Sequence, residues 1–100
     1  MARLDFHPMP GGGAGYVLDV QAELLDHLAT RVVVPLLPAQ SAPAPISELN
    51  PVFEIGGERH VMLTQALAAI PLRELKRPAG SLAERHDAVT RALDTLLIGF

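Results

Sequence analysis

The C-terminal stretch of the chain reads SLAERHDAVTRALDTLLIGF (residues 81–100). Large apolar side chains recur in it at the following positions: Val89, Leu93, Leu96, Leu97 and Phe100. This spacing is typical of a helix with one apolar face. Ser81 followed by Glu84 matches a capping box, in which both side chains accept backbone N–H groups at the start of a helix. We therefore predict one helix over residues 82–98.

The preceding eighty residues carry strand patterns instead. Apolar and polar residues alternate in two short stretches, and a third stretch is three consecutive valines, whose β-branched side chains fit a pleated sheet. Two further apolar runs flank Gly56-Gly57, and this predicts a tight hairpin because glycine accepts the positive φ of such turns. The strands are expected at residues 3–7, 16–22, 32–34, 52–55, 58–64 and 72–75.

Proline and glycine mark the connections between these strands. Residues 8–15 hold two prolines and four glycines, and residues 37–49 are rich in Pro, Ala and Ser, so both stretches are expected to be loops. Residues 65–70 are expected to form a short helical turn. Because Pro35 has no N–H to donate, the strand at residues 32–34 should end there or lie where that N–H is not needed.

The composition restricts the class of protein. The chain has 100 residues, 49% of them apolar and 19% charged, with no cysteine and a net charge of −3. The length predicts a single domain over residues 1–100, and the low charge excludes a disordered tail. The acidic balance argues against a freestanding nucleic-acid binder. No apolar run reaches the roughly 20 residues of a membrane span, and the absence of cysteine fits the cytoplasm.

Histidines and glycines give little indication of catalysis or metal binding. The four histidines are scattered along the sequence, at His7, His27, His60 and His86. They lack the local spacing of a zinc site, so we predict surface or boundary histidines and no metal. The glycine-rich residues 11–15 are not followed by the Gly-Lys-Ser/Thr of a phosphate-binding loop. We therefore expect no cofactor.

The remaining polar residues are also poor candidates for a catalytic site. A catalytic triad could be proposed from Ser81, His86 and Asp87. It is a weak candidate, because Ser81 is better used as a helix cap. Six basic residues are expected mainly as solvated surface charges. They are Arg3, Arg31, Arg59, Arg73, Lys76 and Arg77.

The end of the predicted helix is apolar on more than one side, because residues 96–100 hold four large apolar side chains. A helix of this kind must bury one face on its own sheet and another on something else. We interpret this end as a dimer seam with a partner-binding tip. The alternative is a helix buried wholly in its own core. Together the patterns predict a mainly β domain with a C-terminal helix.

Three stretches that follow one another along nearly the whole chain resemble the CcdB toxins of toxin–antitoxin pairs. They are residues 16–26 with 31–36, residues 49–58 with 62–64 and 68–71, and residues 82–87 with the ending Gly99-Phe100. The resemblance implies an SH3-like small β-barrel of the CcdB and MazF type, with one C-terminal helix. It also implies a homodimer in which the two helices meet at the twofold axis.

The same resemblance implies a toxin that is not an enzyme. CcdB-like toxins bind the A subunit of DNA gyrase, inhibit it and trap the gyrase–DNA cleavage complex. A CcdA-like antitoxin neutralises the toxin, and operator DNA is bound only through the toxin–antitoxin complex. The gyrase-binding positions of the family match Leu24, Leu25, Asp94, Leu97, Ile98, Gly99 and Phe100, and the dimer-interface positions match Leu96 and Phe100.

The chain departs from the family at the helix end. The best-known members carry a tryptophan that stacks on an arginine of gyrase, preceded by a phenylalanine; here these places are taken by Ile98 and Leu97. A ring stacked on a guanidinium is worth about 0.5–2 kcal/mol. One alternative is therefore a CcdB-like protein with lost or altered gyrase activity. A second alternative is a MazF-like mRNA endoribonuclease on the same fold, which would need its basic residues to cluster; the acidic balance and the scattered arginines count against it.

Overall fold

The computed structural model describes residues 2–99. Within them the chain forms seven strands and one α-helix, joined by loops and short 3-10 turns. The strands are β1 (Asp5–Pro8), β2 (Tyr16–Asp19), β3 (Thr30–Pro38), β4 (Val52–Ile55), β5 (Glu58–Met62), β6 (Ala68–Pro71) and β7 (Gly80–Ser81), and the helix is α1 (His86–Leu97). The prediction of a mainly β domain with a C-terminal helix is confirmed.

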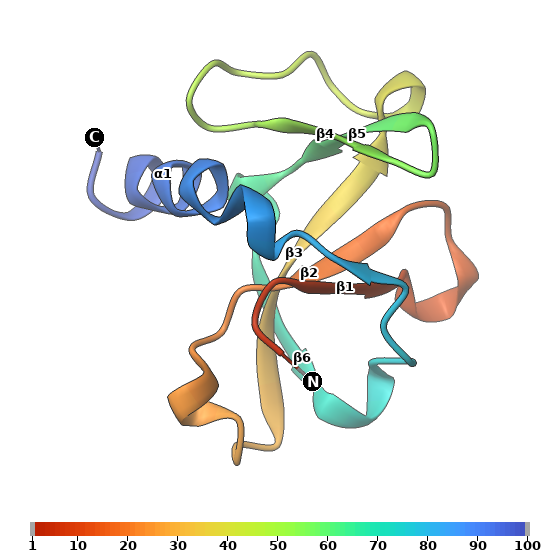
Figure 1. Cartoon of the computed structure of the whole chain (residues 1–100), viewed down its shortest axis with the longest axis vertical. Helices are drawn as coiled ribbons and strands as arrows, with labels where there is room; N and C mark the ends of the chain where they lie inside the picture. Colours follow the sequence, from red (N-terminus) through yellow and green to blue (C-terminus); the bar gives the residue numbers. More distant parts are fainter. Residues whose placement is uncertain (1, 100) are drawn as a thin grey trace.

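All strand pairs are antiparallel, and they form one sheet in the order β4-β5-β3-β2-β1-β7, with β6 also paired to β3. Figure 1 shows a strongly curved sheet, with α1 beside it and the C-terminal end of α1 directed away from the body of the molecule. No helix in the described part of the chain is long and apolar enough to cross a membrane.

The long strand β3 organises the sheet. One edge of β3 pairs with β2, whereas the other edge pairs with β6 along Thr30–Val33 and with β5 along Leu36–Pro38. Pro35 lies between these two partners, and its carbonyl accepts the N–H of Leu63 at 2.9 Å. The strand therefore passes through Pro35 because the missing N–H falls where the edge changes partner.

The predicted hairpin at Gly56-Gly57 is confirmed. β4 pairs with β5 from Val52↔Val61 to Ile55↔Glu58, and the two glycines between the strands have φ angles of 62° and 79°. Positive φ at both central residues is the geometry of the two-residue turns that follow the right-handed twist of the strands.

Several predicted strand limits are wrong. Residues 3–7 shift to β1 at Asp5–Pro8, because Leu4 has a φ of 71° and lies in a turn before the strand. The strand predicted at residues 16–22 ends at Asp19, and the one at residues 58–64 ends at Met62. Alternation of side chains places residues on faces, but it does not locate the last ladder bond of a strand.

The region after β5 was assigned in the wrong order. A 3-10 turn occupies Thr64–Ala66, strand β6 follows at Ala68–Pro71, and a second 3-10 turn replaces the strand predicted at residues 72–75. The pairing of Ala68 and Ala69 with β3 explains the difference. Tertiary pairing makes a strand here from alanines, which have little intrinsic preference for one.

The helix is shorter at its start than predicted. A 3-10 turn at Ala83–Arg85 precedes α1, and Ser81 belongs to the short strand β7. The Ser81 hydroxyl accepts the N–H of Ala83 at 3.1 Å, so it caps this 3-10 turn and not α1 as the predicted box required. The Arg85 guanidinium lies over the Phe53 ring, 4.9 Å from its centre, and holds the start of α1 on β4.

The core lies between the curved sheet and α1. Its members come from both, and they are mostly Leu and Val: Leu4, Phe6, Leu18, Val20, Val34, Leu36, Phe53, Met62, Leu82, Val89 and Ala92. Two phenylalanines are among them, and Phe6 packs edge to face on Tyr16 with the ring centres 5.0 Å apart. Aliphatic side chains therefore supply most of the buried area in this aromatic-poor chain.

Candidate partner-binding site

The end of α1 forms the first part of the site, the helix tip (residues 94–99). Leu97 and Ile98 are 70% and 60% exposed, so this end is not buried in its own chain. Gly99 has a φ of 99°, and its N–H and that of Ile98 both donate to the Asp94 carbonyl, at 3.0 and 2.8 Å. Glycine at positive φ commonly ends helices because it has no Cβ to clash. The predicted site residue Phe100 lies outside the described residues.

The second part of the site is the turn segment (residues 22–30), which connects β2 to β3 through a 3-10 turn at Glu23–Leu25. Leu24 is 85% exposed and Leu25 is 41% exposed. The N–H groups of Leu25 and Asp26 donate to the carbonyls of Ala22 and Glu23, at 2.9 and 3.1 Å. This local bonding presents the two predicted leucines to solvent.

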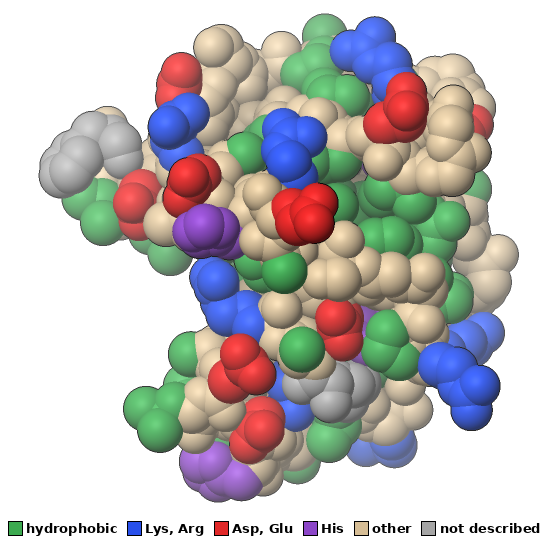
Figure 2. All heavy atoms as spheres, in the orientation of Figure 1, with side chains coloured by type: hydrophobic (Ala, Val, Ile, Leu, Met, Phe, Trp, Pro, Cys, Tyr) green, Lys and Arg blue, Asp and Glu red, His purple; other side chains and the backbone are tan. Residues whose placement is uncertain are grey.

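The helix tip and the turn segment project on the same side of the molecule. In Figure 1 the end of α1 stands above the orange turn that carries the two leucines, both at the left edge. Figure 2 shows green apolar side chains at each projection and an indented outline between them. The described residues predicted to bind gyrase thus lie on two separate projections, while the predicted dimer residue Leu96 is half-buried.

This site is convex and does not coincide with the hollow on the surface. A hollow of about 170 Å³ lies between α1 and the loop before β4, lined by Glu48, Pro51, Ala88 and Arg91. None of these four residues was predicted as a site residue. Exposed leucines and an isoleucine on two projections suit a macromolecular partner better than a small molecule, which is usually enclosed in a cavity.

Three buried polar side chains lie directly beneath the turn segment, and we call them the anchor cluster: Asp19, Gln21 and Arg31. The prediction that Arg31 is a solvated surface charge is wrong, because Arg31 is only 4% exposed. Its Nη1 lies 3.2 Å from Oδ2 of Asp19, which is fully buried. Burial of both charges together satisfies the rule that a buried charge needs a partner.

Burial also changes the protonation chemistry of Asp19. Loss of solvent contact raises the pKa of the Asp19 carboxyl above its usual value of 3.8. The Gln21 N–H, the positive charge of Arg31 and the nearby His7 oppose this rise without cancelling it. The charged form of the Asp19 carboxyl is therefore stabilised by the Gln21 N–H and the Arg31 guanidinium and not by solvent.

Two backbone hydrogen bonds of Leu4 join the end of β2 to the segment before α1. The Leu4 N–H donates to the Asp19 carbonyl at 2.7 Å, and the Leu4 carbonyl accepts the Leu82 N–H at 2.8 Å. One residue thus links the end of β2, where the turn segment begins, to the segment that leads into α1. The positive φ of Leu4 is unusual for a side chain of this size and costs of order 1–3 kcal/mol.

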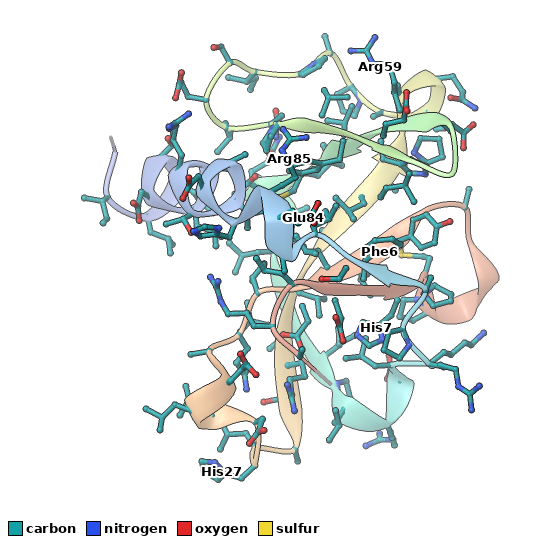
Figure 3. The ribbon with its side chains drawn as sticks, viewed as in Figure 1. Phe6, His7, His27, Arg59, Glu84 and Arg85 are labelled. Atoms are coloured by element: carbon teal, nitrogen blue, oxygen red, sulfur yellow. The ribbon has the colours of Figure 1, made fainter. Side chains whose placement is uncertain are left out.

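The four histidines do not gather into a metal site, and two of them lie deeper in the fold than predicted. His7 is fully buried and His60 is 3% exposed, whereas both were expected at the surface or its boundary. The ring Nδ1 of His7 lies 2.7 Å from the Lys76 carbonyl and ties β1 to the segment before β7 (Figure 3). Among residues 2–99 no three His, Asp or Glu side chains gather to hold a metal ion.

The residues considered as a catalytic triad, Ser81, His86 and Asp87, do not form one. His86 Nε2 lies 3.0 Å from Asp87 Oδ1, but both side chains are largely exposed. The Ser81 hydroxyl is engaged with the Ala83 N–H. In the described chain no hydrogen bond joins Ser81 to His86, so no relay activates its hydroxyl.

The basic residues are not gathered in one groove. Arg31 is buried in the anchor cluster, and Arg59 lies near the β4–β5 end of the molecule (Figure 3). The basic residues of segment 72–77 lie at the opposite end, in the turquoise part of Figure 1. This dispersal does not favour the ribonuclease alternative, which needs basic side chains clustered along an RNA groove.

The family model of the CcdB protein matches residues 4–99, which is nearly the whole chain. The match covers both projections, the anchor cluster and every described strand. CcdB proteins are toxins that act on DNA gyrase without catalysis, as partners in toxin–antitoxin pairs. Fold, surface and family model agree, and the chain belongs to the CcdB family.

Proposed function

We propose that this chain is the toxin of a type II toxin–antitoxin pair and that it binds the A subunit of DNA gyrase. It acts as a single cytoplasmic domain over residues 1–100. The proposed binding residues are Leu24, Leu25, Asp94, Leu97, Ile98 and Gly99 on the two projections, together with Phe100. Binding inhibits gyrase and traps its cleavage complex with DNA.

The observation that carries this proposal is the exposure of leucine and isoleucine on both projections. Leu24, Leu97 and Ile98 are each at least 60% exposed, and the resemblance to the family matches them to gyrase-binding positions. Large apolar side chains gathered on one side of a small protein mark an interaction surface. The β-barrel scaffold serves to hold these two projections apart at a fixed geometry.

The same proposal includes three partners besides gyrase. A second copy of the chain packs against the helix end through Leu96 and Phe100. A CcdA-like antitoxin covers the toxin, and operator DNA is bound only by the toxin–antitoxin complex. The half-buried side chain of Leu96 supports the dimer, because a second helix end would complete its burial.

A supercoiling assay with purified DNA gyrase tests the function. Folded wild-type protein at micromolar concentration is expected to inhibit supercoiling and to accumulate covalent gyrase–DNA complexes. The double variant Leu24→Ser/Leu97→Ser is the control, because both side chains are exposed and their replacement leaves the core intact. Absence of inhibition by the folded wild-type protein would show that the tested gyrase is not the target.

A second candidate function rests on Ile98. The aliphatic side chain is 60% exposed at the place where the best-known relatives carry the stacking tryptophan. Isoleucine offers apolar contact but no π face for a guanidinium. Growth arrest on expression, rescued by a gyrase mutation, supports the toxin; growth without a defect favours a member with lost or altered gyrase activity that retains only antitoxin binding.

A further inference from the structure

Apolar side chains hold the turn segment only weakly to the body of the protein, because Leu24, Leu25 and Leu28 are 85%, 41% and 40% exposed. All nine of its residues are exposed, including the two leucines proposed to bind gyrase. The residues that flank it, Gln21 and Arg31, are only 8% and 4% exposed. These two buried side chains supply side-chain hydrogen bonds to the turn, beside the backbone bond from the Leu72 N–H to the Ala29 carbonyl at 2.8 Å at its C-terminal end.

Gln21 bonds the turn segment from its N-terminal side. Its side-chain Nε2 donates to the Leu25 carbonyl at 2.9 Å, and its Oε1 accepts the Val32 N–H at 3.0 Å. One amide group thus joins the backbone of a proposed binding residue to strand β3. Both bonds are shielded from water at Gln21, so losing either leaves a poorly solvated backbone group.

Arg31 bonds the turn segment from its C-terminal side. Nη2 of Arg31 donates to the Asp26 carbonyl at 2.9 Å while Nη1 donates to Oδ2 of Asp19 at 3.2 Å. Oδ1 of Asp19 in turn accepts the Gln21 N–H at 3.0 Å. The planar guanidinium is therefore oriented by a buried carboxylate so that its second nitrogen meets the turn.

We propose that Gln21 and Arg31 are positioning residues for gyrase recognition, which hold the Leu24–Leu25 turn in its binding geometry through the carbonyls of Leu25 and Asp26. This inference rests on the proposed gyrase-binding function. Neither side chain meets the partner itself. Both act through the backbone of the turn, which leaves the leucine side chains free for binding.

The consequence for affinity follows from the population of the bound geometry. A turn without its anchor samples other conformations, and the observed Kd rises by the inverse of the fraction of time it is correctly placed. A turn that is correctly placed about one tenth of the time raises Kd about tenfold. The stability of the fold and dimer formation depend on other contacts, so they should not change in proportion to the rise in Kd.

The test compares Gln21→Met with Val61→Ala in the full-length chain. Methionine keeps the length of the side chain but loses both amide bonds, whereas Val61 is buried in β5 and pairs with Leu37, outside the anchor cluster. Both variants are compared at temperatures equally far below their own Tm. Kd for purified gyrase A subunit and amide hydrogen exchange over residues 22–30 are measured.

The expected result is a Kd about tenfold higher for Gln21→Met, with less than a twofold change for Val61→Ala and an unchanged dimer state. Exchange over residues 22–30 should accelerate about tenfold in Gln21→Met and stay unchanged in Val61→Ala. Equal effects of the two variants on Kd, or an unchanged exchange rate in the turn of Gln21→Met, would overturn the inference while leaving the proposed function in place.

Arg31→Lys provides a second variant if Gln21→Met does not fold. Lysine keeps the charge beside Asp19 but lacks the fork that reaches both Asp19 and the Asp26 carbonyl. The same rise in Kd and in turn exchange supports the inference, and a variant that binds as the wild-type protein does overturns it. Wild-type protein that binds no gyrase A subunit contradicts the proposed function and removes this inference with it.

Discussion

Replacement of Leu24 by alanine separates binding from folding more cleanly than any other change in this chain. The Leu24 side chain is 85% exposed, so its removal should change the free energy of unfolding by less than about 0.5 kcal/mol. Full burial of a leucine side chain is worth about 1.5–3 kcal/mol. Nearly all of that is still available for a partner, and Leu24→Ala should lose about 1–2.5 kcal/mol of binding per copy.

This loss corresponds to a Kd about 5- to 70-fold higher, at about 1.4 kcal/mol per factor of ten. Binding to immobilised gyrase A subunit measures the change, and thermal unfolding measures stability. Ile46→Ala is the matched control, because Ile46 is 56% exposed in the loop before β4 and is not a proposed site residue. The control should bind as the wild-type protein does.

The reasoning is refuted if Leu24→Ala binds within twofold of the wild-type protein while remaining folded. The turn segment would then lie outside the interface, however exposed its leucines are. An equal loss in Leu24→Ala and Ile46→Ala would also refute it, because the effect would then reflect general surface apolarity. Either result would leave the helix tip as the remaining candidate surface.

Three further predictions concern affinity, pH dependence and packing. Ile98→Trp should lower Kd for gyrase by about 2- to 30-fold per copy in a titration, because an exposed ring adds about 0.5–2 kcal/mol of stacking on a guanidinium; no gain would show that no cation lies at that place. The raised pKa of Asp19 favours its neutral form in the fold, so its contribution to stability is fullest below pH 3.8 and is lost as pH rises through the raised pKa. Urea unfolding should therefore show the stability of wild-type protein relative to Asp19→Asn falling as pH increases from 3.8, and a rising difference would contradict the burial argument. Gly80→Ala should lower the stability by about 1–3 kcal/mol in thermal unfolding, because the new Cβ overlaps the Phe6 ring, whereas Gly13→Ala meets only the flexible Met9 side chain and should be nearly neutral.

The parts of the fold that could be predicted from the sequence are those with local signals. The hairpin depends on two adjacent glycines at positive φ, and α1 depends on apolar residues at helical spacing. Both signals lie within about ten residues, and both were confirmed. Strand β6 has no such signal, because its Ala68 and Ala69 become a strand only by pairing with β3.

The anchor cluster was missed for a related reason. Asp19 and Gln21 alternate with apolar residues, and this pattern favours a strand with one polar face in water. In the structure β2 lies between β1 and β3, and both faces at its end are covered. Only the fold brings Arg31 to Asp19 across twelve residues of sequence, so single-sequence patterns do not identify the pair.

The residue types of the anchor cluster can be explained by the proposed role of the turn segment, which presents Leu24 and Leu25 to a partner. A leucine that must bind a partner cannot also be fully buried in its own core, so Leu24 and Leu25 can contribute little to holding the turn segment in place. The backbone carbonyls of the turn segment remain available as hydrogen-bond acceptors. The side-chain amide of Gln21 and the guanidinium of Arg31 are suitable donors to them. Burial of these donors excludes competing water and gives the bonds their value, at the cost of desolvating Asp19 and Arg31. The buried ion pair is thus better explained by the placement of an exposed binding turn than by a contribution to stability.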